Sequence, residues 1–457
     1  MSDIAKTPAA APRLRRTLTL WDLILYGVIV IQPVAPMSVF GVLSDRGHGH
    51  VVTTILIAMV AMLFTAISYG RMARAYPSAG SAFTYVGQEI NPALGYVTGW
   101  SMVMDYMLNP MICTIWCSQQ AHVFAPGVPY WIWAVFFVLV FTGLNVQGVK
   151  TSARVNSALA AGMGLVIVIF FVVAARYIFG HPHDEPGFFT RPFYDPALWN
   201  TRAVLGGTSI AVLTYIGFDG ISTLSEEAEN PRRNILLATV LTCLVIGILS
   251  AFEVYAAQLI WPASQPFPDV DTAAVHAAAR AWKPMFAIMG FTLLVANFGS
   301  GLGSQVGAAR LLYGMGRSNA LPKSFFGMVD AKHRVPRNNV LFVGVLALAA
   351  ALLVTRGWFS YGLGAEMLNF GALIAFMGVN VAAFMRYVVR DQKWTVSFIA
   401  PPVLGFVICL GLWLSLSNPA KIAGTIWMVA GIAFGAWKTR GFRGDLVNFD
   451  LPAEDES

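Results

Sequence analysis

The chain has 457 residues, of which 57% are hydrophobic and 12% charged, with a formal net charge of +7. The charged fraction is about half that of a typical soluble domain, and apolar runs of about 18 or more residues, the length of a membrane span, recur throughout. The composition therefore excludes a soluble enzyme and indicates an all-α polytopic membrane protein. The sequence has no Walker loop, nucleophile elbow or metal-ligand cluster, so we expect no enzymatic activity, no metal and no cofactor.

Twelve transmembrane helices are predicted from the apolar runs. They cover residues 18–43, 51–73, 92–121, 130–149, 155–179, 203–224, 235–261, 285–311, 338–355, 365–386, 397–416 and 420–437.

The positions of the basic residues predict the topology. If the N-terminus is cytoplasmic, 22 of the 30 Lys and Arg residues fall in cytoplasmic segments. Because positive charge is enriched on the cytoplasmic side of membrane proteins, both termini, including the tails 1–17 and 438–457, are predicted to be cytoplasmic. Topology thus accounts for the basic net charge, and we expect no nucleic-acid partner.

Two of the predicted spans are interrupted near their centres. Span 1 contains Pro33 and Pro36, which remove backbone donors and clash with the preceding turn. Span 6 contains Gly217, which gives up helical order readily, at the start of the stretch Gly217–Phe218–Asp219. Each is the first of five spans, and five is odd, so a second five-span unit begins from the opposite face of the membrane.

This pattern predicts a pair of inverted repeats. The first repeat covers residues 18–180 and the second covers 200–392, followed by a hairpin at 397–437 for which we expect packing or homodimer contact. Two broken helices at matching places in inverted halves point to a transporter's binding site at the membrane midplane. The alternative is ordinary proline kinking within a helix bundle.

The carboxylates Asp105 and Asp219 lie near mid-depth of spans 3 and 6. A carboxyl group at bilayer depth is costly and usually functional. Desolvation favours its neutral form, whereas a bound cation favours its charged form, so such a group can alternate between a proton and a cationic substrate. For Asp105 the alternative is a hydrogen-bonded structural acid beside Pro110.

Two further acids, Glu253 and Glu226, each have two alternative interpretations. Glu253 in span 7 either extends a cation path or is partly solvated in a water-filled cavity. Glu226, at the cytoplasmic end of span 6, fits an inner gate or a solvated helix end equally well. Of the aromatic residues, Tyr106, Tyr215 and Phe218 are candidates for cation–π contact with an ammonium group, because they adjoin the acids.

Three motifs, in this order, resemble those of the amino acid–polyamine–organocation (APC) transporters, which share the leucine-transporter fold. They are SYGRMARAYPSAGSAFTY at 68–85, EEAENPRRN at 226–234 and ARLLYGMGRSNALP at 309–322. INPALGYVTGW…DYMLNPM at 90–111 and LNFGALIAFMGVN at 368–380 are similar to those of bacterial putrescine importers in this family. The resemblance covers roughly residues 15–440.

The resemblance implies that the substrate is held by the breaks of spans 1 and 6 and by the middle of spans 3 and 8. The corresponding residues here are Gln32, Pro33, Asp105, Tyr106, Tyr215, Ile216, Gly217, Phe218, Asp219, Asn297, Ser300 and Ser304. It further implies gating or coupling roles for Asp105, Asp219 and Glu226.

The chain departs from the family pattern in two places. Members that bind an α-carboxylate have a glycine-rich loop in span 1, whereas this chain has QPVAP at 32–36. Some proton-coupled members have a lysine midway along span 5, where this chain has ALAAGMG at 158–164.

We therefore expect a secondary-active importer in the bacterial inner membrane that takes up a small organic cation, such as putrescine or a related polyamine, with H⁺ as the coupling ion. The alternative within the superfamily is an amino acid permease for zwitterionic or basic substrates. From other classes, a substrate-sensing receptor or a channel could share this composition, but a channel would need continuous polar stripes and the sequence shows only isolated acids.

Overall fold

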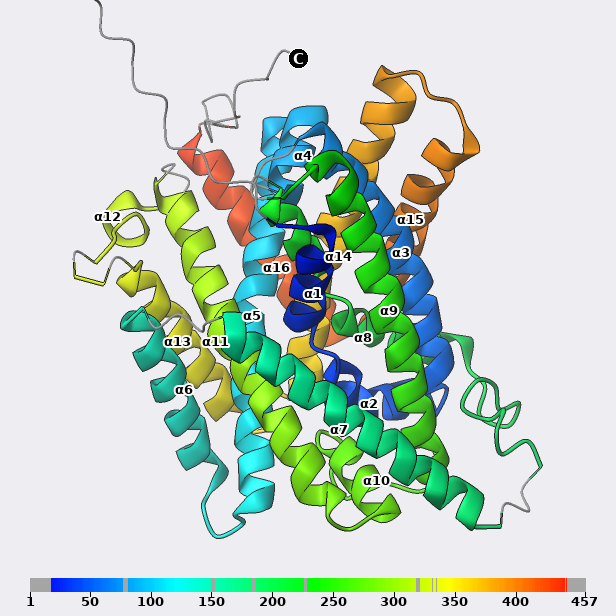
Figure 1. Ribbon diagram of the computed structural model, residues 1–457. Helices are drawn as coiled ribbons and strands as arrows, with labels where there is room; N and C mark the ends of the chain where they lie inside the picture. Colours follow the sequence, from blue (N-terminus) through cyan, green and yellow to red (C-terminus); the bar gives the residue numbers. More distant parts are fainter. Residues whose placement is uncertain are drawn as a thin grey trace, which may run out of the picture.

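A computed structural model describes residues 18–76, 81–148, 153–182, 186–225, 228–317, 321–330, 332–333, 335–439 and 441. The described part of the chain is helical and contains no β-strand, apart from one isolated bridge between Leu18 and Ala228 (Figure 1). The all-α prediction is therefore confirmed.

The first five predicted spans correspond to helices in the structure. Span 1 is divided into α1 (Leu20–Ile31) and α2 (Ala35–Arg46), and spans 2 to 5 are α3 (Val51–Ala75), α5 (Pro92–Phe124), α6 (Tyr130–Val146) and α7 (Ala153–Gly180).

Span 6 is composite, and the later spans are mostly single helices. Span 6 comprises α8 (Thr201–Ala211) and two 3₁₀ segments, η1 (Val212–Thr214) and η2 (Phe218–Leu224). Spans 7 to 12 are α9 (Pro231–Ile260), α11 (Met285–Arg317), α13 (Arg337–Val354), α14 (Tyr361–Phe384), α15 (Val396–Leu414) and α16 (Asn418–Lys438), and α14 continues into a π-helical turn, η3 (Met385–Arg390). Three short helices lie in the loops and are not among the predicted spans: α4 (Ser81–Glu89), α10 (Ala273–Ala281) and α12 (Lys323–Phe326).

Nine helices in the described part of the chain are long and apolar enough to cross a membrane, and α1 with α2 forms a tenth if the bent pair is one span. The apolar helix α6 is shorter, with 17 residues, and α5 lacks a sufficiently apolar stretch. The predicted count of twelve therefore remains a prediction.

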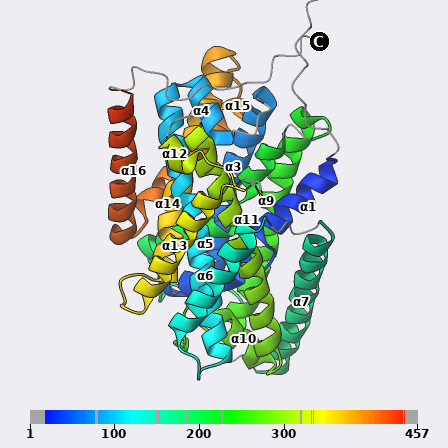
Figure 2. The ribbon, with the colours of Figure 1, turned by 90° about the vertical axis from the view of Figure 1, so that its left-hand side faces the viewer.

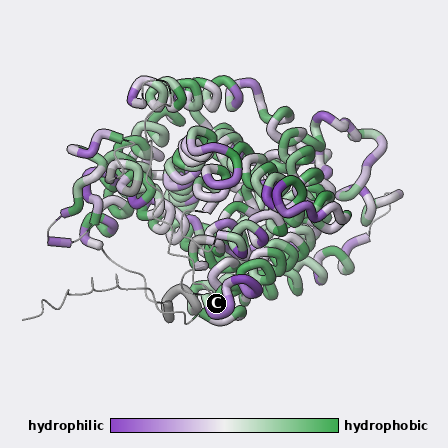
Figure 3. Tube along the Cα trace, turned by 90° about the horizontal axis from the view of Figure 1, so that it is seen from above, coloured by the Kyte–Doolittle hydropathy of each residue, from purple (hydrophilic) through white to green (hydrophobic). Residues whose placement is uncertain are grey.

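The helices stand roughly side by side, with the described chain ends on one face of the bundle, the near side, and α10 on the opposite face, the far side (Figure 1). The broadest helix contacts join α3 to α9 and α5 to α11 and α14. The flanks are formed by α7 and α16 (Figure 2). Apolar side chains such as Val172 of α7 and Ile426 of α16 are 64% and 65% exposed, as expected for helices that face lipid. Hydrophobic residues line much of the bundle's outer surface, and hydrophilic residues gather at helix ends and loops (Figure 3).

The C-terminal hairpin is attached through a tryptophan pair. Trp100 of α5 and Trp427 of α16 stack with ring centroids 4.8 Å apart. Each indole N–H donates to the other residue's carbonyl oxygen, at 2.9 and 3.2 Å. Packing against α5, one of the two roles expected for the hairpin, is therefore observed, and a role in homodimer contact remains a prediction.

Ion pairs made by two buried glutamates connect the ends of several helices. On the near side, Glu89 of α4 accepts hydrogen bonds from Tyr76 (2.5 Å) and Arg386 (3.2 Å), which attaches the end of α3 and η3 to α4. On the far side, Glu366 of α14 pairs with Arg46 of α2 and also accepts from the N–H of Ser417 at 3.0 Å. The far-side contact joins the end of α2, the second half of span 1, to α14.

Asp271, in the far-side loop before α10, is expected to make the stability of the protein depend on pH. Its carboxylate accepts a hydrogen bond from Gln119 Nε2 at 2.7 Å, and its carbonyl accepts from Trp116 Nε1 at 3.0 Å. Burial raises the pKa of Asp271 from 3.8 to about 6. The folded protein therefore binds a proton more tightly than the unfolded chain, and stability should fall as pH rises from about 4 to about 6, by at most roughly 3 kcal/mol.

Replacing Asp271 by Asn should remove this pH dependence and raise thermal stability at pH 7. The new amide can accept from Gln119 Nε2 and also donate to Gln119 Oε1, a buried atom without a hydrogen-bond partner among the described residues. Thermal unfolding in detergent at pH 4.5 and pH 7 measures the effect. If the unfolding temperatures of the parent and of D271N change equally between the two pH values, Asp271 is not the source of the pH dependence.

Candidate functional site

The break in span 1 lies at Gln32–Val34. The chain leaves α1 at Ile31 and enters α2 at Ala35 with a bend of 46°. Gln32 has a φ of 69°, a conformation that side-chain-bearing residues rarely adopt. The predicted interruption is confirmed, although it is narrower than 32–36. Pro36 lies in the first turn of α2, where the N–H that proline lacks is not needed.

The break in span 6 begins earlier than the sequence predicts. The α-helix ends at Ala211, and residues 212–224 form 3₁₀ segments on either side of Gly217, which has a φ of 120°. The side-chain amide of Asn369, on α14, donates to the carbonyls of Ser209 (2.7 Å) and Ile210 (3.3 Å). These bonds give the carbonyls at the helix end a further donor within the membrane, where no water is available.

The two breaks are in contact. A Cβ atom built on Gly217 would lie 2.9 Å from Cγ1 of Val30, 3.2 Å from Cγ1 of Ile31 and 3.5 Å from the backbone N of Ile31. The glycine therefore allows the unwound part of span 6 to approach the end of α1 more closely than any other residue would.

Asp219 lies at the start of η2 and is 5% exposed. Its carboxylate accepts a hydrogen bond from the N–H of Gly217 at 3.2 Å, and the N–H groups of Asp219 itself and Gly220 also face it. Backbone N–H groups at a helix start stabilise negative charge. The unwound segment thus fixes the carboxylate in place beside the break.

Asp105 lies on α5 and is 6% exposed, and its carboxylate has no hydrogen-bond partner among the described residues. Asp105 and Asp219 are close enough for their charges to interact. The next residue, Tyr106, packs its ring against Gly307 of α11, where a built Cβ would lie 3.1 Å from the ring. Two buried carboxyl groups from separate spans therefore share one region of the protein interior.

Tyr69 of α3 belongs to the same region and is not among the residues predicted from the sequence. Its ring packs edge-on against Phe218 and Tyr85, with centroid distances of 5.5 and 6.2 Å. Its fully buried hydroxyl has no hydrogen-bond partner in the described part of the chain, and the charges of Asp105 and Asp219 act on it. The motif at 68–85, which contains Tyr69, was the signal that could have identified it.

Span 8 contacts the broken span 1 through Ala296 and Asn297. Gln32 Nε2 donates to the carbonyl of Ala296 at 2.6 Å, and Asn297 donates to Ser38 Oγ at 3.0 Å. Ser300 and Ser304 follow Asn297 at spacings of three and seven residues, on the same face of α11. The Ser304 hydroxyl donates to the carbonyl of Ser300 at 2.7 Å.

The remaining predicted residues lie in different surroundings, and not all of them point towards the two acids. The Tyr215 hydroxyl donates to the carbonyl of Ile55 at 2.9 Å, so it joins span 6 to α3. Pro33 is buried in the span 1 break, Phe218 packs on Tyr69, and Ile216 is partly buried. Glu226 lies outside the described residues. The structure brings the breaks and the two acids together, and the roles assigned to these residues in binding and gating remain predictions.

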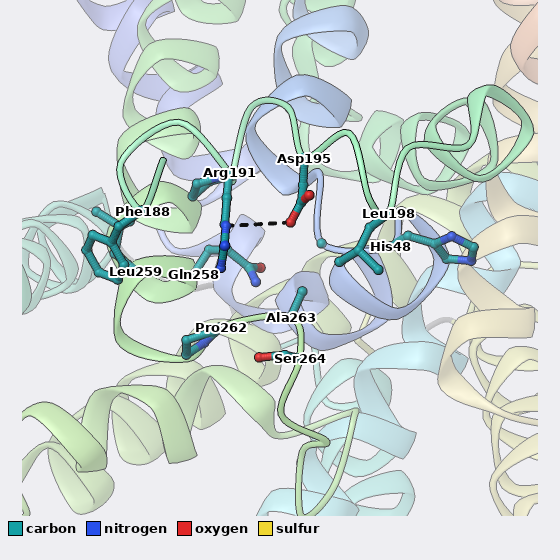
Figure 4. Close-up of a pocket in the computed structure, with 12 residues that line it drawn as sticks. His48, Phe188, Arg191, Asp195, Leu198, Gln258, Leu259, Pro262, Ala263 and Ser264 are labelled. Carbon is teal, nitrogen blue, oxygen red and sulfur yellow. Dashed lines mark ion pairs between the residues drawn. The ribbon is translucent and has the colours of Figure 1, made fainter. Parts of the chain in front are cut away.

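Two surface cavities lie away from the breaks. One, of about 60 Å³, is on the far side between the loop at 188–198 and the end of α9, and contains the Arg191–Asp195 ion pair (Figure 4). The other, of about 450 Å³, is lined by apolar side chains of α5, α6 and α11, including Phe137 and Phe298.

Broken helices that meet beside buried carboxyl groups, in a bundle of apolar helices, define a membrane transporter. The model of the amino acid permease family matches residues 34–446. The chain is 33% identical over 449 residues to the low-affinity putrescine importer PlaP of Escherichia coli K12, covering 96% of each chain. It is 24% identical to the branched-chain amino acid permease BcaP of Bacillus subtilis, covering 94% and 95% of the two chains. It is 26% identical to the cationic amino acid transporter 6 of Arabidopsis thaliana, covering 82% of this chain and 66% of the other.

The chain belongs to the amino acid permease family, within the APC superfamily, and has the leucine-transporter fold. It is therefore a multi-pass membrane transporter of a small molecule and not an enzyme.

Proposed function

We propose that the protein is an importer of a small organic cation, with putrescine or a related polyamine as the first candidate, driven by protons across the bacterial inner membrane. The observation that carries this proposal is the pair of buried carboxyl groups, Asp105 and Asp219, beside the meeting point of the two broken spans. A diamine has two ammonium groups, and each needs an anionic partner because an unpaired buried charge is costly.

The backbone of the span 1 break supports a cationic substrate over an α-carboxylate. Pro33 and Pro36 have no N–H. The N–H groups of Gln32 and Ala35 already donate to the carbonyls of Val28 and Gln32, at 3.0 and 3.1 Å. At span 6, the N–H groups nearest Gly217 face the carboxylate of Asp219. Few donors are left to bind a substrate carboxylate.

Aromatic rings near the acids complete an environment suited to ammonium groups. Tyr69 and Phe218 pack edge-on beside Asp219, and Tyr106 adjoins Asp105. Ring faces attract cations, and the attraction grows when the cation is desolvated. The Tyr69 hydroxyl, which has no partner among the described residues, adds a polar group for an amine N–H.

The orientation follows from the basic residues. With 22 of 30 Lys and Arg residues in segments on the N-terminal side, we place the near side in the cytoplasm and the far side outside the cell. On this assignment Glu89 and its arginines lie at the cytoplasmic end, and the Arg46–Glu366 pair lies at the outer end.

Uptake of labelled putrescine into proteoliposomes tests the proposal. Uptake driven by an inward proton gradient should fall by about tenfold or more when an uncoupler collapses the gradient, and should persist in sodium-free buffer. Competition should rank diamines above monoamines and neutral amino acids, because only a diamine engages both carboxyl groups. Strict sodium dependence would contradict proton coupling, and competition that requires a free carboxylate would contradict the cationic substrate.

The second candidate is an amino acid permease. It is favoured by the similarity to BcaP and to the cationic amino acid transporter, whose names specify amino acids. A neutral amino acid would engage one carboxyl group and leave the other to be neutralised by a proton. A thermal-shift screen of the purified protein separates the two candidates, since the true substrate raises the unfolding temperature by mass action.

A further inference from the structure

Glu253 of α9 is a buried carboxyl group that the proposed amine site does not use. Its side chain is 0% exposed, and neither carboxyl oxygen has a hydrogen-bond partner among the described residues. On the same helix, the hydroxyls of Thr242 and Ser250 are also buried and also lack partners in the described part of the chain. The helix therefore carries three buried polar groups that its described neighbours do not satisfy.

These three side chains lie along one side of α9. Glu253 follows Thr242 by eleven residues, or about three turns, so the two point in nearly the same direction. Ser250 is one turn from Glu253. Thr242 packs against α1, where a Cβ atom built on Gly27 would lie 2.8 Å from its Oγ1. The face that contains Glu253 is therefore turned towards the first broken span and not outward to lipid.

Within the described residues, no charged group stabilises an ionised Glu253. The helices that pack against α9 are α1, α2, α3, α7 and α10, together with η2. Their described titratable residues are Asp22 and Tyr26; Asp45 and Arg46; Tyr69, Arg71 and Arg74; Arg176 and Tyr177; His276 and Arg280; and Asp219. None of these forms a hydrogen bond or ion pair with Glu253.

An isolated buried carboxylate is strongly disfavoured unless it is paired or takes up a proton. In this conformation Glu253 therefore holds its proton. Ionisation requires a change that admits water or a cation, and alternating access supplies such a change during each transport cycle. A carboxyl group whose hydration depends on the conformation is suited to bind a proton on one side of the membrane and release it on the other.

Glu253 lies nearer the far-side end of α9 than the near-side end. Seven residues, about 10.5 Å along a helix, separate it from the last helical residue, Ile260. The pocket of Figure 4 lies on another side of α9, because Gln258, which lines it, is turned by about 140° from Glu253. A proton that reaches Glu253 along the helix therefore has a shorter path from the far side.

We propose that Glu253 is a second proton-binding site of the transporter, separate from Asp105 and Asp219, which is loaded from the far side and contributes to coupling. The proposal rests on the proposed function in taking proton movement to drive uptake. The step makes and breaks only an O–H bond: the carboxylate takes a proton from water on one side and returns it to water on the other.

The Glu253→Gln variant tests this with two separate measurements. Glutamine keeps the size of the side chain and mimics its neutral form. We expect exchange of labelled for unlabelled putrescine, which needs no proton gradient, to stay within twofold of the parent. Accumulation driven by a proton gradient should fall at least fivefold. Equal accumulation by E253Q and the parent would overturn the proposal, as would equal loss of exchange and accumulation.

Infrared spectroscopy of the purified protein at pH 7 measures the proton directly and does not depend on the substrate. The parent should show a protonated-carboxyl band that E253Q lacks and that shifts in D₂O. A difference spectrum that shows ionised carboxylate would overturn the proposal even if putrescine is transported. Conversely, if the protonated-carboxyl band is present but putrescine is not transported, Glu253 remains a proton-binding site and the proposed substrate is wrong.

Two further variants control for structural effects. Ser250→Ala alters a neighbouring buried hydroxyl without removing a titratable group, and should change neither exchange nor accumulation by more than twofold. If E253Q does not fold, Glu253→Asp decides the matter. If E253D still shows uptake driven by the proton gradient, but with a pH profile displaced from that of the parent, Glu253 has a proton-binding role. If the pH profile of uptake by E253D is the same as that of the parent, the proposal is overturned.

Discussion

Replacing Asp219 or Asp105 by Asn is expected to weaken putrescine exchange by tenfold or more in each case. Each substitution removes one charge-assisted contact to an ammonium group, worth roughly 1.5–3 kcal/mol, or about ten- to 150-fold in binding. Exchange of labelled substrate in proteoliposomes at several concentrations measures the change as an increase in the half-saturating concentration. Exchange is the appropriate assay because it reports substrate binding without the driving force.

The structure indicates that both variants fold. In Asp219→Asn the new amide keeps an oxygen that can accept the N–H of Gly217. Asp105→Asn breaks no observed hydrogen bond, since the carboxylate of Asp105 has none among the described residues. Glu253→Gln serves as the matched control, a neutralised acid at membrane depth outside the amine site, and should retain exchange within twofold. If both Asn variants exchange the physiological substrate as well as the parent does, the two-carboxylate site is wrong.

The parts of the fold that the sequence predicted well are those with local causes. The span 1 break follows from Pro33, whose missing N–H and ring act on its own helix, and the structure places the break there. Nine of the described helices agree with the hydropathy pattern, because lipid demands long apolar segments with internally satisfied backbones. The loop helices α4, α10 and α12 were not predicted, because they are shorter than a span.

The parts that escaped prediction depend on distant partners. The early end of α8 at Ala211 is stabilised by Asn369, about 160 residues further along the chain. Tyr215 adjoins the acids in sequence, yet its hydroxyl bonds to Ile55 of α3. Tyr69, by contrast, reaches the acids from another span. On a broken helix, neighbours in the sequence point in unrelated directions, so proximity to Asp219 along the chain is a weak guide to the site.

Gly217→Ala is expected to lower both thermal stability and transport severely. Its φ of 120° suits only glycine, and forcing a side chain into such a conformation costs about 1–3 kcal/mol. The added Cβ would also lie 2.9 Å from Cγ1 of Val30, inside normal contact distance. The two broken spans would have to separate, which would displace Asp219 together with the N–H group that holds it.

Gly220→Ala, three residues further along the same segment, is the matched control. Its φ is not positive, and a Cβ atom there would lie 3.8 Å from Oη of Tyr26, an ordinary contact. Replacing a glycine by alanine at a compatible backbone position is neutral or stabilising. Thermal unfolding and exchange should therefore be close to the parent for G220A and strongly reduced for G217A. If the two variants behave alike, the close approach of spans 1 and 6 at Gly217 does not hold the site together, and the placement of Asp219 beside the span 1 break loses its structural support.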